Sequence, residues 1–183
     1  MNNNIAHIKG RILYKYVTPK ANNVILKIGT GKNIVDCFVS DPILKKHVTD
    51  FSVGNYINLE GNIQSSRRYD ANLNQTKDTQ IIFVDNITPI HYTDRSWYNR
   101  FWLYGKIVRV QELHGCLKLV IRTCNNGHLS FVPIVIYFPD NKIRSISQGS
   151  NIHVEGSVQS VKKYDMINGK HIYYQNYVAS RVW

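Results

Sequence analysis

Hydrophobic and polar residues alternate along several short stretches of the chain. Ile57, Leu59 and Ile63 occupy alternate positions with polar residues or glycine between them. The same period of two recurs in three further stretches, at residues 24–28, 117–121 and 152–158. A period of two is typical of a strand that buries one face and exposes the other. The pattern therefore predicts a protein built mostly from short strands.

Helix signals are concentrated in one stretch. Asp41 is a suitable N-cap, Pro42 suits the first helical position, and the segment continues to Val48. The matching stretch in the second half of the chain, residues 139–146, predicts a single turn at most. We therefore expect one short helix in the first half of the chain.

The chain repeats itself at a constant spacing. Gly10-Arg11-Ile12 recurs as Gly105-Lys106-Ile107, 95 positions later. The same spacing joins three further pairs, namely 60–65 with 155–160, Arg67-Arg68-Tyr69-Asp70 with Lys162-Lys163-Tyr164-Asp165, and Lys27 with Arg122. One offset that joins landmarks along the whole chain indicates an internal duplication.

Each copy contains five stretches with strand character, and the helix follows the third. This order predicts an all-β fold of two tandem five-stranded OB-fold barrels with a short helix between strands three and four. The expected boundaries are 1–90 for the first barrel, 91–100 for a linker and 101–183 for the second barrel. The linker is aromatic instead of rich in Gly and Ser, so we expect it to pack and to hold the barrels in a fixed relation. Another small barrel, such as an SH3-like one, is the alternative.

The chain is strongly basic. Its 183 residues include 23 Lys and Arg against 12 Asp and Glu, a net charge of +11. This balance favours a polyanionic partner, with nucleic acid first and an anionic membrane second. The 12 Tyr and 3 Trp residues supply rings on which bases stack, which favours single strands. A basic surface without a specific partner is the alternative.

Cysteine usage and the N-terminus predict a soluble cytoplasmic protein. Three cysteines, with no CxxC spacing, argue against a disulfide framework. The first residues lack a signal-peptide pattern, and no apolar run approaches ~18 residues, so we expect no membrane contact. His114, Cys116, Cys124 and His128 have the residue types of a zinc site, but both cysteines occupy strand positions and the first copy has no counterpart. We therefore predict neither metal nor cofactor.

The segment Glu155–Asp165 and its counterpart Glu60–Asp70 resemble the fourth-strand region of bacterial single-stranded DNA-binding proteins (SSBs). In the second copy the likeness continues through Asn168-Gly169-Lys170 and Tyr173 to Val182, and both copies begin like that family's first strand. The resemblance implies an OB fold whose groove stacks bases on aromatic rings and contacts phosphates with Lys and Arg. It also implies homodimers that present four OB folds. Family members commonly end in an acidic tail that this chain lacks, as expected for a specialised relative from a mobile genetic element.

The two copies keep basic charge while exchanging Lys for Arg. A phosphate contact tolerates this exchange, whereas a bidentate contact to a base edge does not. Alternation within a strand would turn one of Tyr137 and Phe138 inward, so only one of them is expected to stack. The candidate nucleic-acid-binding residues are Arg11, Lys27, Phe38, Arg67, Arg68, Tyr69, Lys106, Arg122, Tyr137, Lys162, Lys163, Tyr164, Lys170 and Tyr173.

These features predict a sequence-independent single-stranded DNA-binding protein that acts in replication, recombination or mobile-element transfer. The chain contains none of the common catalytic motifs, and its acids are few and scattered, so we expect no enzymatic activity. Three alternatives stay open: an accessory subunit of a primase, helicase or polymerase complex, an RNA-binding OB protein, and a metal-dependent nuclease. The first alternative adds replication proteins to the expected partners.

Overall fold

A computed structural model describes residues 4–70, 75–91, 96–166 and 169–183. These residues form, in chain order, β1 (Asn4–Val17), β2 (Val24–Thr30), β3 (Asn33–Val39), α1 (Pro42–Thr49), β4 (Tyr56–Asp70), β5 (Gln75–Pro89), β6 (Tyr98–Leu113), β7 (Cys116–Asn125), β8 (His128–Tyr137), α2 (Asn141–Arg144), β9 (Asn151–Asp165) and β10 (Lys170–Val182). The predicted all-β class is confirmed.

The first five strands close into a barrel. β1 pairs with β2 and β4, β2 pairs with β3, β3 pairs in parallel with β5, and β5 pairs with β4. Closing the sheet buries one face of every strand and leaves no open edge. The strands β6, β7, β8, β10 and β9 repeat this order of pairing, and β9 pairs with β6.

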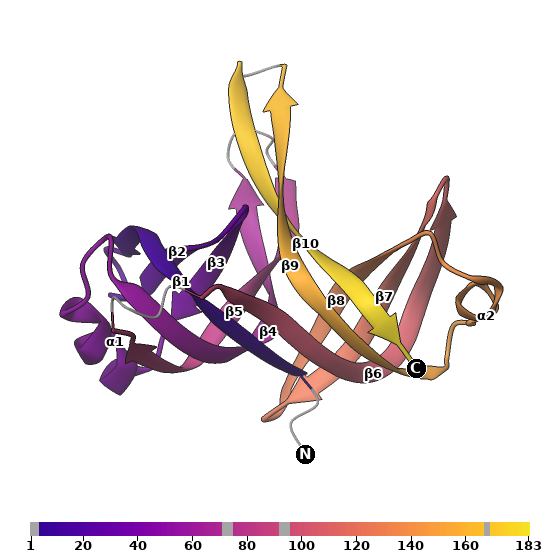
Figure 1. The fold of residues 1–183 in the computed structure, drawn as a ribbon, viewed down its shortest axis with the longest axis horizontal. Coiled ribbons are helices and arrows are strands. Elements are labelled where there is room, and N and C mark those ends of the chain that lie inside the picture. The colour runs from indigo at the N-terminus through magenta and orange to yellow at the C-terminus, as the bar shows by residue number, and fades with distance from the viewer. Residues whose placement is uncertain (1–3, 71–74, 92–95, 167–168) are drawn as a thin grey trace.

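Strands β1 and β6 join the two halves into one sheet of ten strands. Figure 1 shows these strands side by side, with α1 and α2 on opposite sides of the molecule. Asn4 pairs with Leu103, and the residues 95 positions away from these, Asn99 and Ile8, pair with each other. Reciprocal pairing of this kind is what a twofold axis produces. The duplication therefore appears in space as an approximate twofold arrangement.

Two asparagines, one in each strand of this junction, tie their strand to the fourth strand of the same half. Asn4 Oδ1 accepts a hydrogen bond from Ile63 N at 2.9 Å, and Asn4 Nδ2 donates to Ile63 O at 2.7 Å. Asn99 makes the same pair of bonds to the backbone of Val158, at 2.9 and 2.7 Å. Each side chain thus satisfies a backbone N–H and a backbone C=O that have to be paired when they are buried.

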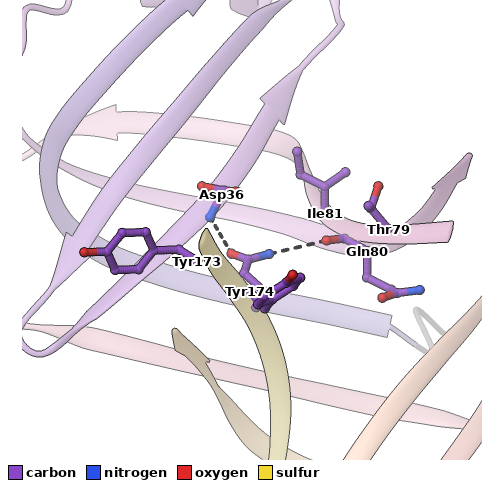
Figure 2. Close-up of a pocket in the computed structure, with 7 residues that line it drawn as sticks. Asp36, Thr79, Gln80, Ile81, Tyr173 and Tyr174 are labelled. Carbon is purple, nitrogen blue, oxygen red and sulfur yellow. Dashed lines mark hydrogen bonds between the residues drawn. The ribbon is translucent and has the colours of Figure 1, made fainter. Parts of the chain in front are cut away.

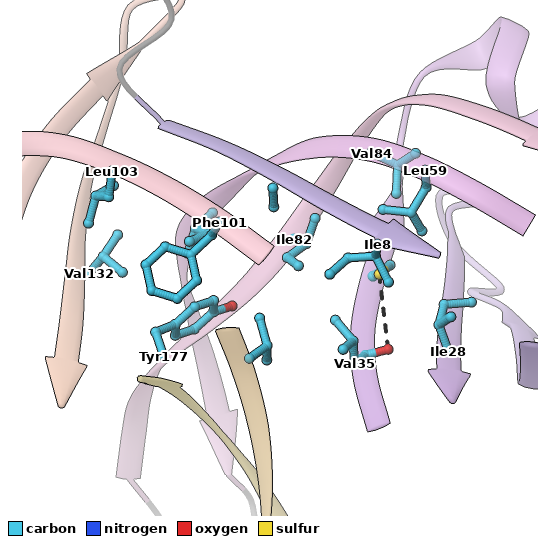
Figure 3. Packing of buried hydrophobic residues seen from close by; sticks show 14 of the residues in the cluster. Ile8, Ile28, Val35, Leu59, Ile82, Val84, Phe101, Leu103, Val132 and Tyr177 are labelled. Atoms are coloured by element: carbon cyan, nitrogen blue, oxygen red, sulfur yellow. Dashed lines mark hydrogen bonds between the residues drawn. The ribbon is translucent and has the colours of Figure 1, made fainter. Parts of the chain in front are cut away.

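One hydrophobic core runs through both halves. Phe101 of β6 and Tyr177 of β10 are almost fully buried and meet edge to face with their ring centroids 5.7 Å apart. Ile8 and Ile82 of the first half belong to the same cluster, as Figure 3 shows. The halves therefore share apolar contacts as well as a sheet.

Two ionisable groups lie in this core. Burial raises the pKa of the Cys37 thiol well above its ordinary value, and the nearby Asp36 carboxylate raises it further. Burial also raises the pKa of the Tyr177 hydroxyl, with smaller contributions from Cys37 and Asp36. Both groups are therefore neutral in the folded protein.

The predicted helix is confirmed as α1. The Asp41 side chain accepts hydrogen bonds from Ile43 N and Leu44 N, both at 2.9 Å, and Pro42 opens the helix. Val48 packs into the core, whereas α2 is a single turn that buries no residue. In the described ranges, neither helix has the length and apolar character needed to cross a membrane.

The repeated Glu-Gly motif marks two close approaches of the backbone. The register of the β4–β5 pairing shifts between Glu60 and Gly61. The register of the β9–β10 pairing shifts just after Ala179, which lies opposite Gly156. A side chain at Gly61 would collide with the carbonyl oxygen of Phe83, and one at Gly156 with that of Val178. Glycine is needed at both positions because only glycine leaves room for the backbone.

The constant spacing fails in the second strand of each half. Ile12 pairs with Ile28, which is 16 residues further on, whereas Ile107 pairs with Ile121, which is 14 residues further on. The first hairpin is therefore two residues shorter in the second half. As a result, Arg122 occupies the position of Gly29, and the counterpart of Lys27 is Val120. The matching of Lys27 with Arg122 is wrong.

Candidate nucleic-acid interface

The β9–β10 hairpin extends well beyond the core, and Figure 1 shows it rising from the middle of the molecule. We call its outer part, residues 159–165 and 170–176, the C-terminal arm. Val158 and Tyr177 face the core, so alternation places Lys162, Tyr164 and Tyr173 on that same face of the arm. The structure therefore brings together three of the predicted residues.

The rings on this face are open to solvent. Tyr173 is 54% exposed and lies directly opposite Lys162, while Tyr164 is 53% exposed. The Tyr164 ring meets the His171 ring edge to face with centroids 5.1 Å apart. Neither Lys162 nor Lys163 has a salt-bridge partner among the residues that the structure describes. The arm thus presents rings and uncompensated positive charge together.

The C-terminal arm rests on β3 of the first half. Ser160 Oγ accepts a hydrogen bond from Ile34 N at 3.1 Å, and Ser160 N donates to Asn33 Oδ1 at 3.2 Å. Directly opposite Ser160 in the hairpin, Gln175 Oε1 accepts a hydrogen bond from Asp36 N. These contacts carry the predicted residues of the second half onto the surface of the first.

The β4–β5 hairpin makes the reciprocal contact. Ser65, which lies 95 positions before Ser160, donates through Oγ to Phe131 O at 2.7 Å and accepts from Phe131 N at 3.0 Å. Each half therefore extends one hairpin onto the third strand of the other half. A linker alone would not impose this fixed relation.

A cavity of about 180 Å³ lies where the C-terminal arm crosses the first half. Figure 2 shows this cavity with Asp36 and Gln80 among the residues around it. The side chain of Gln175 accepts a hydrogen bond from Asp36 N and donates one to Gln80 O at 3.4 Å. The lining residues are Asp36, Thr79, Gln80, Ile81, Tyr173, Tyr174 and Gln175.

Beside this cavity lies the outer face of β2, β3 and β5. Lys27 Nζ bonds to Asp36 Oδ1 at 2.8 Å, so much of its charge is neutralised. Phe38 meets Phe83 edge to face with centroids 4.9 Å apart. Phe83 was not among the residues predicted from the sequence, and only the parallel pairing of β3 with β5 places it beside Phe38.

In the second half, basic residues gather on the outer face of β6 and β7. Lys106 and Arg122 are exposed and directly opposite each other, and Arg109 and Lys118 are exposed on the same two strands. None of the four forms a salt bridge within the described part of the chain. Like charges opposite each other destabilise a sheet, so this surface favours an anion. Arg109 and Lys118 were not among the predicted residues, although their outward-facing strand positions could have indicated them.

The aromatic residues at the end of β8 differ from the expectation. β8 ends at Tyr137, and Phe138 follows in a left-handed conformation with φ of 49°. Both side chains are exposed, at 48% and 85%, so the expectation that one points inward is wrong. The reason is that alternation stops where the strand stops. Phe131, also on β8 and missed by the sequence analysis, is 43% exposed opposite Arg122.

The remaining candidates are placed less completely. Arg11 is exposed on β1. The backbone of Arg67, Arg68 and Tyr69 pairs with β5, and that of Lys170 pairs with Asp165, but the side chains of these four candidates lie outside the described residues. Among the described residues, no three His, Cys, Asp or Glu side chains are grouped as metal ligands would be.

Two solved structures resemble the chain over its whole length. A deletion variant of the single-stranded DNA-binding protein from Thermus aquaticus superposes with a TM-score of 0.71 at 14% identity, covering 100% of this chain and 94% of that chain. The wild-type protein gives a TM-score of 0.67 at 13% identity, covering 100% and 92%. No protein-family model matches the chain, and no curated protein matches it. At these identities the likeness shows the fold alone, which is an SSB-like OB fold.

Proposed function

We propose that this chain binds single-stranded DNA through two OB barrels in tandem, largely without regard to sequence and without a chemical step. The observation that carries this proposal is the C-terminal arm, where Tyr164, Tyr173 and the uncompensated Lys162 share one face. The SSB-like fold supports it.

The chemistry of this surface suits a single strand better than a duplex. Exposed rings bind bases by stacking, and only an unpaired strand offers the flat faces of its bases. Lysine and arginine side chains without partners attract phosphates and release counterions when they bind them. We assign stacking to Phe38, Tyr164 and Tyr173. The phosphate contacts are assigned to Lys106, Arg122, Lys162 and Lys163.

The direct test is fluorescence anisotropy with a labelled oligo-dT of about 30 nucleotides, its duplex and its RNA counterpart, at two salt concentrations. We expect tight, salt-sensitive binding that favours the DNA single strand. Equal affinity for all three ligands would reduce the interaction to general attraction between opposite charges. Preference for the RNA would favour the RNA-binding alternative.

The double substitution Lys162→Ala/Lys163→Ala tests the assigned phosphate contacts. The slope of log K against log salt is negative, and each lost contact makes it shallower by about 0.7 for a single strand, so loss of the pair should make it shallower by about 1.4. The matched control is Lys46→Ala/Lys142→Ala, which removes the same charge from the two helices. An unchanged slope in the first variant, or an equal change in the control, would remove the arm lysines from the site.

Replication proteins as partners, a homodimer with four OB folds and a role in replication, recombination or mobile-element transfer stay predictions from the resemblance. Each concerns the biological setting of the proposed binding and needs a separate test.

A further inference from the structure

A carboxylate lies in the middle of the proposed binding surface. Asp36 lines the cavity under the C-terminal arm, and its side chain is 36% exposed. A negative charge beside a path for phosphates weakens binding by repulsion. A carboxylate at this position can still contribute to binding if it accepts a hydrogen bond from the ligand.

The backbone and the carboxylate of Asp36 each have one partner. The backbone N–H donates to Gln175 Oε1 of the C-terminal arm, and Lys27 Nζ binds the carboxylate at Oδ1, at 2.8 Å. Within the described residues, the other oxygen, Oδ2, has no hydrogen-bond partner. The arrangement leaves one fixed, charged acceptor for a ligand.

Aromatic residues occur on both elements that bring Asp36 and Gln175 together, β3 and β10. Tyr173 lies on the same face of β10 as Gln175, lines the cavity and is 54% exposed. On β3, Phe38 follows Asp36 on the same outer face and contacts Phe83. Flat rings close to a polar acceptor make a site for a planar ligand with an N–H donor at its edge.

We infer that this cavity is a nucleobase subsite that prefers bases with an exocyclic amino group over thymine. The amino N–H donates to Asp36 Oδ2, as carboxylates accept from the amino group of cytosine in known recognition. Thymine places a carbonyl oxygen at the corresponding edge, and two acceptors repel each other. This inference rests on the proposed function and adds a base preference to it.

The test compares labelled oligo-dC with oligo-dT, because the two pyrimidines have rings of equal size. For the wild-type protein we expect oligo-dC to bind about twofold to tenfold more tightly, the range of one hydrogen bond. Asp36→Asn should bring the two affinities to within about twofold of each other, since the amide no longer offers a charged acceptor. It should also strengthen binding of oligo-dT, which makes no hydrogen bond to Asp36, because one negative charge is lost.

Glu112→Gln is the matched control. Glu112 pairs with Arg144, away from the cavity, so this substitution removes a negative charge without touching the subsite. It should keep the wild-type ratio of the two affinities. If Asp36→Asn impairs folding, an oligonucleotide of N4,N4-dimethylcytosine tests the same hydrogen bond with the wild-type protein. This base stacks but has no amino N–H to donate. Its affinity for the wild-type protein should fall to that of oligo-dT.

The outcomes separate the inference from the proposed function. Equal binding of oligo-dC and oligo-dT by the wild-type protein overturns the inference alone. So does a ratio that Asp36→Asn leaves unchanged. Failure of the protein to bind either oligonucleotide overturns the proposed function itself.

Discussion

The protonation of one buried residue, Cys37, makes the stability of the folded protein depend on pH. Its folded pKa is raised by burial, whereas the unfolded thiol ionises near pH ~8.5. Below that pH both states are protonated and the stability is fully present. As pH rises further, the unfolded state loses a proton that the folded state keeps, so stability is lost.

We therefore expect the urea midpoint to fall between pH 8 and about 9.5, below the range in which tyrosine titrates. Cys37→Val should flatten this fall, because it leaves an apolar group in the same place. Cys124→Ser, at an exposed position, should not change it. A pH profile that Cys37→Val leaves unaltered would mean that other groups cause the loss.

Residues of the candidate site could be predicted from the sequence where a basic residue recurs at the matching position of both copies. Lys162 and Lys163 were found in this way, and the structure leaves them exposed and without salt bridges in the described ranges. Asp36 and Gln175 were not predictable as cavity residues. They come from different halves and meet only because the C-terminal arm crosses β3.

At the scale of elements, the asparagine pair at the junction can be tested. Asn99→Ala removes the partners of Val158 N and Val158 O, and each unsatisfied backbone group costs about 1–3 kcal/mol. The free energy of unfolding, measured with urea, should fall accordingly. The control is Asn151→Ala at the exposed first residue of β9, where we expect a change within about 0.5 kcal/mol.

Similar losses in the two variants would show that the Asn99 bonds are replaced by water. The asparagine was not identified from the sequence as a structural residue. A polar residue inside a strand is expected to be exposed unless the neighbouring strand is known, and here that neighbour, β9, lies 59 positions further along the chain.

The whole molecule should unfold as one unit. Phe101 and Tyr177 lie in the same apolar cluster as Ile82, so the cores of the two halves are continuous. Calorimetry should show one transition whose calorimetric and van't Hoff enthalpies agree. Ile82→Ala should lower its midpoint without splitting it, through a loss of about 2–5 kcal/mol.

Val53→Ala, at a position 60% exposed, is the control and should leave the midpoint nearly unchanged. Two separate transitions, of which Ile82→Ala moves only one, would show that the halves are independently stable.

The sequence by itself determined the strand content, the helix at Pro42 and the duplication. These follow from local rules, because alternation, capping and repetition are written into neighbouring residues or a constant spacing. Only the tertiary structure decided which residues meet across the two halves. The reciprocal hairpin contacts, the shared core and the cavity at Asp36 depend on packing between segments about 40 to 140 positions apart in the chain. The shift that separates Lys27 from Arg122 likewise arises from hairpin length, which strand pairing reveals and a constant spacing conceals.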